Sequence, residues 1–501
     1  MVIKKTRLWR FIEIVPGAIA WLFLILPIIF SFVSPFTVAI FVLLFDFYWL
    51  IRAFYMAWYL MLSYRRMKKA LRTNYKEKID GFVSSDGIKS DNLYQAIMFA
   101  TFREEIETLR PSVLSVIESD WENKRKIIVL AGEERDHDRL ARVANELREE
   151  FANEISDFLV FEHPDGIAGE VRGKGAGAAW AGKRFREYVL SRGIDDVNVI
   201  VTIADADTRF NPQFFNCVAY QFLKEEDRHH RTYQPIPLYS NNIWHAPTIS
   251  RLTAWGSSFW QMIEASRPWR LINFATHCYS LKMIHEMGYW SVDVVNEDSR
   301  QFWNAYYAFS GNHKAIPIYL PVYLDAVLAD DFITTLKNQY LQKRRWAYGV
   351  EHLPFIVTQA IKHKEIPFKD RFLKIWRLME GTISWSTASF YLMFVGWLPT
   401  IFSENFRHTV LAHNFPAFSR IILSAAWIAM IISVYVSLSF LPKKPKGFRT
   451  IKYLEMIADW IVTPVSAVVF GSIPALESQT RLMLGKYLTF WVTPKITKKN
   501  E

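Results

Sequence analysis

Cysteine is nearly absent from this chain, which has only Cys217 and Cys278 in 501 residues. Two cysteines cannot build a disulfide framework, and a reducing compartment suits the part of the chain that holds them. Glycine-rich phosphate fingerprints are also lacking, because neither a P-loop nor a GxGxxG follows a strand in register. The sequence has no internal repeat and no nucleophile–base signature, which disfavours a transporter with paired repeats and catalysis through a covalent enzyme intermediate.

Positive charge is in excess, with 60 Lys and Arg against 49 Asp and Glu and a net charge of +11. Such an excess can indicate a nucleic-acid partner. Here the cations instead gather beside long apolar runs, as they do on the cytosolic flanks of membrane spans. We therefore expect a membrane protein with no nucleic-acid partner.

Two apolar runs stand near the N-terminus. Ile14 to Val33 is 20 residues without a charge, and a helix of that length matches the hydrocarbon core of a bilayer. A second run continues to about Leu62 after a neutral link, and both outer flanks are basic. No small-residue cleavage site follows the first run, so it indicates an anchor and not a removable signal peptide. We predict a hairpin over residues 1–70 with both ends in the cytosol.

A second pair of apolar runs lies in the C-terminal third. Gly381 to Phe402 is uncharged for 22 residues and Ile421 to Leu441 for 21. Basic residues follow the second run. The pattern predicts a transmembrane helix pair over residues 381–442, again with both outer ends in the cytosol.

Two segments beside this pair are ambiguous. Residues 351–380 mix basic and aromatic side chains and predict interfacial helices, the alternative being a soluble helix packed on the large domain. Within the tail of residues 443–501, Trp460 to Leu476 is uncharged for only 17 residues and contains two prolines. An interfacial or re-entrant helix is therefore favoured over a further span, which would place the basic C-terminus outside.

Residues 71–350, between the two helix pairs, alternate strand and helix signals. Strands are expected at residues 91–101, 126–131, 158–161 and 197–204, with helices at 103–119, 137–151 and 176–190. This βαβαβ order predicts an α/β domain with an open, mostly parallel sheet. Ligands of such sheets bind at the carboxyl ends of the strands.

Two carboxylates, Asp205 and Asp207, end the buried strand that begins at Val199. Their spacing of two directs both side chains to the same side of an extended chain. Together with a diphosphate, such a pair can ligate one hard divalent cation, Mg²⁺ or Mn²⁺. A solvated turn is the alternative, because Asp-Ala-Asp is a common tripeptide.

Two helix starts carry further candidate groups. Arg172-Gly-Lys174-Gly opens a helix, where backbone amides and the Lys174 charge favour a phosphate, although a flexible surface loop has the same composition. Asn296-Glu297-Asp298 opens another, where acidic residues are either helix caps or functional groups. The functional interpretation makes Asp298 the general base that deprotonates an acceptor hydroxyl.

Gln342, Arg345 and Trp346 share one face of a predicted helix, at positions i, i+3 and i+4. Arg345 suits a pyrophosphate leaving group, and Trp346 offers a stacking platform for a sugar ring. An Arg–Trp pair is also an ordinary anchor at a membrane surface.

In this order, between membrane helices, the motifs resemble those of the family 2 membrane glycosyltransferases, which include cellulose, chitin and hyaluronan synthases. The family's pattern is Asp-x-Asp, an acidic pair ending in the base, and Gln-x-x-Arg-Trp, and it covers here about residues 92–346. The resemblance implies a GT-A-type, mostly parallel sheet catalytic domain inserted between transmembrane α-helix pairs. It also implies metal-dependent, inverting transfer of a hexose or N-acetylhexosamine from a nucleotide-sugar donor, UDP-linked in our expectation.

The resemblance also assigns roles to residues. Asp298 is implied as the base, and Asp205 and Asp207 as ligands of Mg²⁺ or Mn²⁺. Contacts to the donor are implied for Thr101, Glu104, Glu133, Lys174 and Asp205. Contacts to the acceptor or the pyrophosphate are implied for Glu297, Gln342, Arg345, Trp346 and Cys278, the last with His277 as pocket lining.

The tail carries one more match. Phe490-Trp-Val492-Thr493-Pro-Lys495 has the form Phe-x-Val-Thr-x-Lys, which resembles the gating loop of bacterial cellulose synthase. The sequence also departs from the family, because Asp-Asp-Gly after the second strand is replaced by a segment containing Glu133, which we expect as a nucleobase contact. The chain ends soon after the gating motif, where polymer synthases have two further spans, and this disfavours processive export.

The leading interpretation is a polysaccharide synthase-like enzyme acting on a glycan acceptor, multi-pass in the plasma (inner) membrane, with the catalytic domain and both termini cytosolic. The runner-up transfers sugar non-processively to a lipid or lipid-linked acceptor, and the short membrane region favours it. A third alternative is a non-catalytic scaffold that binds nucleotide sugar, which the retained carboxylates disfavour. Asp46 and Arg52, inside the second apolar run, are expected to make structural polar contacts, the alternative being a role in translocation.

Overall fold

The computed structural model describes residues 6–493. Within that range eight strands form one sheet in the order β3-β2-β1-β4-β7-β6-β8-β5. They are β1 (Tyr94–Ala100), β2 (Lys126–Glu133), β3 (Asp157–His163), β4 (Val199–Asp205), β5 (Arg209–Phe210), β6 (Arg231–Tyr239), β7 (His277–Ser280) and β8 (Lys314–Leu324). The first four are the strands predicted from the sequence, in the predicted order.

Strand directions confirm the predicted fold class, an α/β lobe with a mostly parallel sheet joined to apolar helices. β1 pairs in parallel with β2 and with β4, β2 with β3, and β6 with β8. β7 runs antiparallel to β4 and β6, and the short β5 runs antiparallel to β8. The parallel β1 and β4 lie at the centre of the described sheet, where their carboxyl ends meet.

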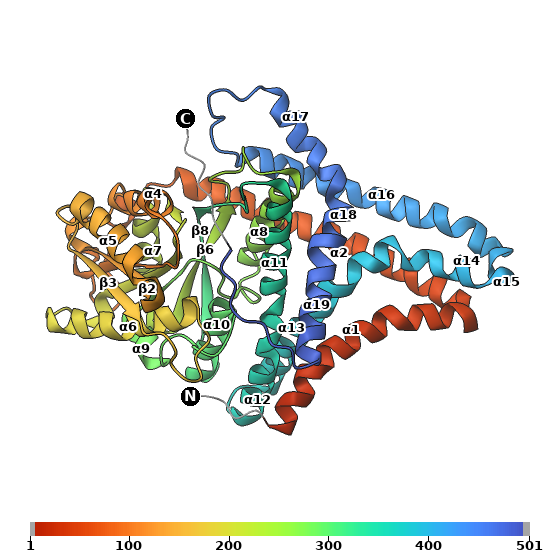
Figure 1. Ribbon diagram of the computed structural model, residues 1–501, viewed down its shortest axis with the longest axis horizontal. Helices are drawn as coiled ribbons and strands as arrows, with labels where there is room; N and C mark the ends of the chain where they lie inside the picture. Colours follow the sequence, from red (N-terminus) through yellow and green to blue (C-terminus); the bar gives the residue numbers. More distant parts are fainter. Residues whose placement is uncertain (1–5, 494–501) are drawn as a thin grey trace.

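Helices cover both faces of the sheet (Figure 1). One face packs against α4 (Ile106–Ile117), α5 (His137–Phe151) and α7 (Phe214–Lys224), and the other against α6 (Lys174–Ser191) and α9 (Leu281–Glu286). An apolar core lies on each face of the sheet, and alternate residues of β1 pack into one or the other. Ile97 and Phe99 pack into the first core, and Ala96 and Met98 into the second. Because neither face meets water, the central strands are unbroken apolar runs in the sequence.

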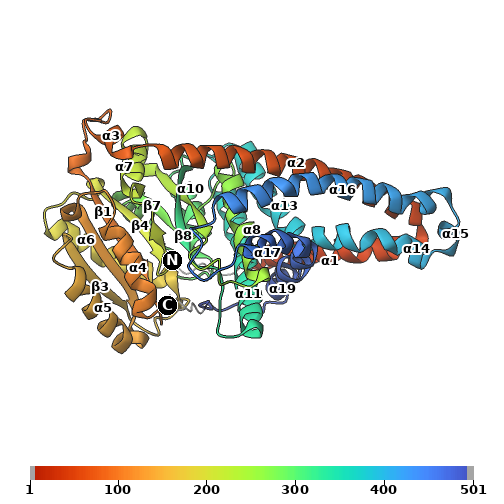
Figure 2. The same ribbon diagram turned by 90° about the horizontal axis from the view of Figure 1, so that it is seen from above.

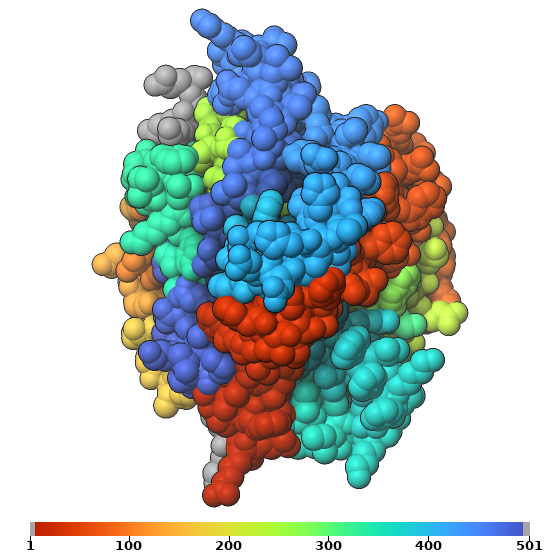
Figure 3. Space-filling view, turned by 90° about the vertical axis from the view of Figure 1, so that its right-hand side faces the viewer, coloured from red at the N-terminus to blue at the C-terminus, as the bar shows by residue number. Residues whose placement is uncertain are grey.

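Two long helices connect this lobe to the far end of the molecule. α1 (Arg7–Val33) ends at Ser34, and α2 (Pro35–Arg72) begins with proline, whose missing N–H costs no helical bond at that position. α2 then runs back to the sheet, with α16 (Val410–Ser439) beside it (Figure 2). Figure 3 looks onto the far end, where the red α1 meets the light-blue segment that leads into α16.

Among residues 6–493, four helices are long and apolar enough to cross a membrane: Arg7–Val33, Pro35–Arg72, Val410–Ser439 and Ile451–Met483. The first two coincide with the predicted N-terminal pair. The third contains most of the predicted run Ile421–Leu441. All four carry exposed large apolar side chains on their outer surfaces, as expected of helices that face lipid.

The predicted span Gly381–Phe402 is not one helix. α13 (Phe368–Met393) ends at Phe394, and a short turn leads into α14 (Leu398–Phe402), which has proline in its first turn. α13 begins inside the segment expected to hold separate interfacial helices, so no helix boundary falls at residue 380.

The stretch Ile451–Met483 contains Trp460–Leu476, which was expected to be a short interfacial helix. Pro464 and Pro474 stand in the first turns of successive helical segments, where proline removes no helical hydrogen bond. A π-type turn at Val468–Ser472 joins the segments. The prolines therefore do not interrupt the stretch, and its length exceeds the expectation.

The charged residues inside the second apolar run make polar contacts. Asp46 is buried and accepts a hydrogen bond from Ser419 Oγ of α16 at 2.9 Å. Arg52 donates to Tyr48 Oη at 2.8 Å and forms an ion pair with Glu380 of α13. Partners of this kind offset the cost of charge inside an apolar helix bundle.

The contact between α1 and α19 (Ile473–Met483) is close enough to be tested. A Cβ on Gly17 would lie 2.9 Å from Gln479 O and 2.9 Å from Met483 Cβ, so Gly17→Leu must push the helices apart. Overpacking of this kind costs about 1–3 kcal/mol, which should lower the melting temperature in detergent. Leu22→Phe adds volume on the exposed side of α1 and should leave it unchanged. Equal melting temperatures for the two variants would contradict the close packing of α1 against α19.

Candidate active site

One cavity of about 1140 Å³ lies at the carboxyl ends of the central strands. Its wall includes residues at the ends of β1, β2, β4, β6 and β8, the start of α10 (Glu297–Ala308) and the last turns of α11 (Phe332–Ala347). The cavity continues to α2 and α13. The switch point of an open parallel sheet is where ligands are expected, and the cavity lies there.

Asp205 and Asp207 both line this cavity. Asp205 is the last residue of β4, and its Oδ1 accepts a hydrogen bond from Lys174 Nζ at 3.0 Å. Asp207 is buried, and its Oδ2 accepts from the Asp325 backbone N–H at 2.9 Å. The Asp207 carbonyl accepts from Asn241 Nδ2 at 3.1 Å. These contacts fix the strand end and the turn after it, so the pair is not a freely solvated turn.

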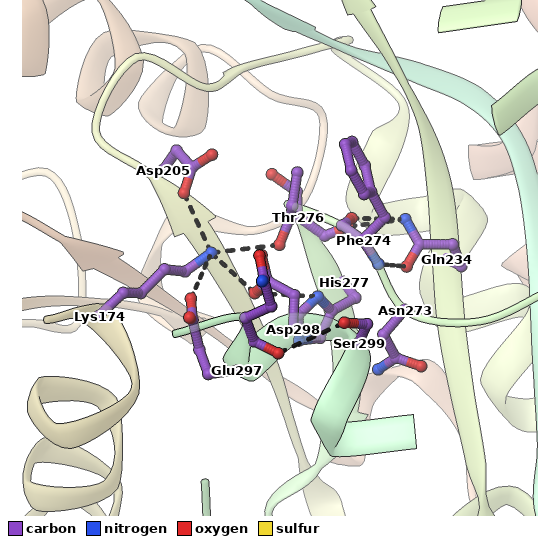
Figure 4. Close-up of polar contacts among 12 residues, drawn as sticks. Lys174, Asp205, Gln234, Asn273, Phe274, Thr276, His277, Glu297, Asp298 and Ser299 are labelled. Carbon is purple, nitrogen blue, oxygen red and sulfur yellow. Dashed lines mark hydrogen bonds and ion pairs between the residues drawn. The ribbon is translucent and has the colours of Figure 1, made fainter. Parts of the chain in front are cut away.

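Lys174 is the first residue of α6 and reaches between two carboxylates (Figure 4). Its Nζ lies 3.0 Å from Asp205 Oδ1, 3.0 Å from Asp298 Oδ1 and 4.0 Å from Glu297 Oε1. Burial by itself lowers the pKa of Lys174, but the three carboxylates outweigh it and raise that pKa above its ordinary value. The lysine is therefore an ammonium ion that joins the end of β4 to the start of α10.

Glu297 and Asp298 form the first turn of α10. Burial raises the pKa of Asp298, and the nearby Lys174 ammonium opposes that rise. Burial and the charge of Asp298 raise the pKa of Glu297. The helix N-terminus stabilises carboxylates here, which is the capping role considered from the sequence. The same position also exposes Asp298 to the cavity.

Glu351 was not predicted as a site residue, yet it holds the loop before α10. Its Oε1 accepts from the backbone N–H groups of Val295 at 2.9 Å and Asn296 at 3.0 Å. Asn296 Nδ2 donates to Arg345 O at 2.9 Å. Burial raises the pKa of Glu351 to about 7. One signal was present, a lone carboxylate in the apolar segment that follows Trp346.

Gln342, Arg345 and Trp346 all line the cavity, as their shared helix face predicts. The Trp346 ring contacts Phe274, with ring centroids 5.5 Å apart. Phe274 is held in turn by a pair of hydrogen bonds with Gln234, 2.9 Å each, which Figure 4 shows. The platform of Trp346 is thus fixed from both α11 and the loop before β7.

The tail crosses the same cavity, which Phe490, Val492 and Thr493 help to line. The Phe490 ring lies 5.0 Å from the Arg345 guanidinium. It also presses on Gly173, whose φ is +148°, and a Cβ there would meet the ring at 2.6 Å. Lys495 of the gating-like motif lies outside the described residues.

The residues predicted to contact the nucleobase line the cavity near the ends of β1 and β2. Thr101 Oγ1 donates to Glu104 Oε2 at 3.0 Å. Glu133 pairs with Arg135 at 2.6 Å. Together with Lys174, these residues extend the cavity wall away from Trp346.

Cys278 and His277 do not line the cavity, so the interpretation of both as pocket lining is wrong. The cavity wall contains Asn273 to Ala275, after which the chain enters β7. Cys278 is fully buried in the sheet core, where its Sγ accepts from Thr202 Oγ1 at 3.2 Å. The His277 ring is also fully buried.

The carboxylates of this cavity can hold a divalent cation only if the substrate supplies further ligands. No group of three or more His, Cys, Asp or Glu able to hold a metal occurs within residues 6–493. Asp205 and Asp207 contribute carboxylate oxygens at one wall, and oxygen is what Mg²⁺ and Mn²⁺ prefer. Among residues 6–493, seven carboxylates line this part of the cavity against the cations of two residues, Lys174 and Arg345. This excess of carboxylates favours the binding of a further cation that also contacts a phosphate group of the ligand.

No protein-family model and no curated protein matches this sequence. Among solved structures, the chain is similar to the mannosyltransferase PcManGT from Pyrobaculum calidifontis in complex with GDP-Man and Mn²⁺, at 12% identity and a TM-score of 0.43, over 88% of this chain and 100% of that one. It is similar to S. aureus TarS 1-349 in complex with UDP, at 10% identity and a TM-score of 0.36, over 80% and 94%. It is also similar to GalNAc-T7 with UDP, GalNAc and Mn²⁺, at 11% identity and a TM-score of 0.31, over 72% and 60%. Likeness of this size does not decide a shared activity.

Glu351→Gln should loosen the loop before α10. Glutamine keeps one acceptor oxygen but brings an N–H₂ group toward backbone donors, which leaves a buried amide unsatisfied at a cost of about 1–3 kcal/mol. Amide hydrogens of residues 293–299 should therefore exchange faster, as measured by mass spectrometry. Glu365→Gln, on the surface, is the matched control. Unchanged exchange in the first variant would show that the loop does not depend on Glu351.

Proposed function

We propose that this chain is a membrane-bound inverting glycosyltransferase that uses a nucleotide-sugar donor, UDP-linked in our expectation. The observation that carries the proposal is the position of Lys174 Nζ, 3.0 Å from both Asp205 and Asp298 within one cavity. Lys174, which suits a diphosphate, and Asp298, the candidate base, are thereby held a few ångströms apart. Inverting transfer needs a base beside the acceptor hydroxyl and a counter-charge for the leaving diphosphate within one site, and these residues can supply both.

In the proposed reaction Asp298 accepts the proton of an acceptor hydroxyl. The hydroxyl oxygen forms a bond to the anomeric carbon of the sugar, and the bond from that carbon to the diphosphate oxygen breaks. The electron pair leaves with the nucleoside diphosphate, whose charge Lys174 and Arg345 stabilise. Asp205 and Asp207 would hold a divalent cation, which supplies further charge neutralisation when bound.

The remaining residues orient the reactants. Trp346, braced by Phe274, gives the acceptor sugar a ring to stack on. Thr101 and Glu133 lie at the end of the cavity proposed for the nucleobase. Phe490, between Gly173 and Arg345, places the tail where it excludes water from the leaving group.

The proposed setting is the plasma (inner) membrane, with the α/β lobe of residues 71–350 and both termini in the cytosol. Basic flanks next to α1, α2 and α16 support this orientation. Gln-x-x-Arg-Trp and the tail motif support a polysaccharide synthase-like enzyme with a glycan acceptor. The extension of the cavity to α2 and α13 favours a second candidate, transfer to a lipid or lipid-linked acceptor.

Turnover should require a nucleotide sugar together with Mg²⁺ or Mn²⁺, because the leaving diphosphate needs its charge neutralised. The test is release of nucleoside diphosphate by purified protein in nanodiscs, measured over a panel of nucleotide sugars. Excess chelator and Asp207→Ala should each abolish release, and added Mn²⁺ should restore only the chelated wild type. Full turnover in chelator would refute the metal assignment, and no turnover with any donor would refute the transferase.

Asp298→Asn should remove transfer while donor binding is kept. The change is nearly isosteric, so it deletes the base without emptying the site, and a lost general base costs at least ~10²-fold in rate. Rate is measured by product formation and donor binding by calorimetry. Asp138→Asn, in the exposed first turn of α5, is the matched control. If Asp298→Asn kept more than half of the wild-type rate, Asp298 would be a helix cap only.

A further inference from the structure

The cavity has two parts of opposite charge. Among residues 6–493 the donor half, at the strand ends, has seven lining carboxylates and two cations. The membrane half, toward α2, α8 (Thr248–Ala265) and α13, has two lining carboxylates, Glu264 and Asp370. Its cations are six: Arg52, Arg270, Lys314, Lys343, Lys374 and Arg377. Arg52, Arg270 and Lys374 are paired with Glu380, Glu264 and Asp370, and the remaining cations leave this half with an excess of positive charge.

Lys343 lies in the membrane half without a carboxylate partner among the described residues. Its Nζ donates to Ser257 Oγ at 2.9 Å and lies 4.7 Å from the centre of the Trp346 ring. No acidic side chain lies within 4.0 Å of it among residues 6–493. Burial lowers the pKa of Lys343 to about 7. Lys343 is half-buried, so its ammonium loses part of its hydration without gaining a carboxylate partner, and an anionic ligand offsets that cost.

Between α2 and α13 the cavity wall also contains large apolar side chains beside its charged ones. Trp49 and Met56 of α2 face this part, with Leu378 and Trp385 of α13. The ion pair of Arg52 with Glu380 ties the same two helices together. α2 is one of the helices long and apolar enough to cross a membrane. The wall between α2 and α13 therefore offers apolar side chains for a lipid chain beside cations for an anionic headgroup.

We propose that the acceptor is a membrane lipid whose phosphate is held by Lys343 and whose headgroup hydroxyl is presented to Asp298. This rests on the proposed function, and it names the acceptor class of that site. The hydroxyl gives its proton to Asp298, its oxygen bonds to the anomeric carbon, and the nucleoside diphosphate leaves with the electron pair of the broken bond. The lipid phosphate is not consumed. Its charge is balanced by Lys343 and kept apart from the donor's diphosphate.

Two other acceptors fit fewer of these observations. A neutral glycan accounts for the aromatic residues of the wall but leaves Lys343 without a counterion. An acidic soluble glycan would satisfy Lys343 but has no use for the apolar wall between α2 and α13. The lipid phosphate accounts for both features.

The test uses the full chain in phosphatidylcholine nanodiscs and radiolabelled dodecyl phosphate below its micelle concentration, with empty nanodiscs as background. Wild type should bind the probe by equilibrium dialysis, and Lys343→Gln should weaken binding at least ~10-fold, as expected for a lost charge-assisted contact. Lys343→Arg should restore part of it. Lys337→Gln, on the exposed side of the same helix, should bind as wild type. If Lys343→Gln does not fold, Lys343→Met replaces it, since its stem also covers Trp346.

Dodecyl maltoside, a glucuronate oligosaccharide and inorganic phosphate are the competing ligands. Equal binding of dodecyl phosphate by wild type and Lys343→Gln overturns the proposal, as does tighter binding of the maltoside or the oligosaccharide. Inorganic phosphate binding as tightly as dodecyl phosphate overturns the lipid source. Donor binding is measured on the same nanodiscs by calorimetry. If wild type does not bind the nucleotide sugar, the proposed function is contradicted. If it binds the nucleotide sugar but its binding of dodecyl phosphate does not depend on Lys343, only the acceptor class is contradicted.

Discussion

The site depends on one ammonium group. Lys174 lies between carboxylates that come from β4 and from α10, and without it these groups would repel one another. At an effective dielectric of 20, two unit charges 4 Å apart interact by about 4 kcal/mol, which is a large fraction of a protein's net stability. The position of Lys174 is in turn set by the turn at Gly173, where the tail residue Phe490 presses. Sheet, α10 and tail therefore meet through one side chain.

A second constraint comes from the end of α11. The segment that carries Arg345 and Trp346 continues into Glu351, whose carboxylate anchors the backbone before α10. Arg345 itself accepts, through its carbonyl, a bond from the Asn296 side chain. The residues proposed for the leaving group, the acceptor and the base thus move as one unit. A shift of α11 would displace all three together.

The sequence allowed prediction of those parts that depend on local pattern. β1 to β4 and the place of Asp205 at a strand end follow from apolar runs and strand order, because parallel strands bring their carboxyl ends together. That Lys174, Asp298 and Trp346 belong to the same site was implied by the family resemblance and not by a local pattern. The prediction for Cys278 was wrong because β7 has only four residues. So short a strand shows no alternation of apolar and polar residues that would separate core positions from cavity positions. Contacts such as Glu351 with Val295 or Arg52 with Glu380 join distant segments, so no local pattern predicts them. Pro464 and Pro474 were expected to interrupt a helix. The energetic cost of a proline depends on its position within a helical turn, which the sequence alone does not give.

In the proposed reaction, the separation of charge within the cavity would keep the two substrates' phosphates apart. Carboxylates at the strand ends suit a cationic ligand and repel an anion that arrives without one, so the proposed donor diphosphate would bind there together with a divalent cation. The opposite holds beside Lys343, a half-buried cation that donates to Ser257 Oγ and has no carboxylate partner among residues 6–493. Two reactants that both carry phosphate would repel each other in an evenly charged cavity. In the proposed reaction the donor diphosphate would be neutralised by a divalent cation and the lipid phosphate by Lys343, so that only the neutral sugar and the hydroxyl would need to meet over Asp298.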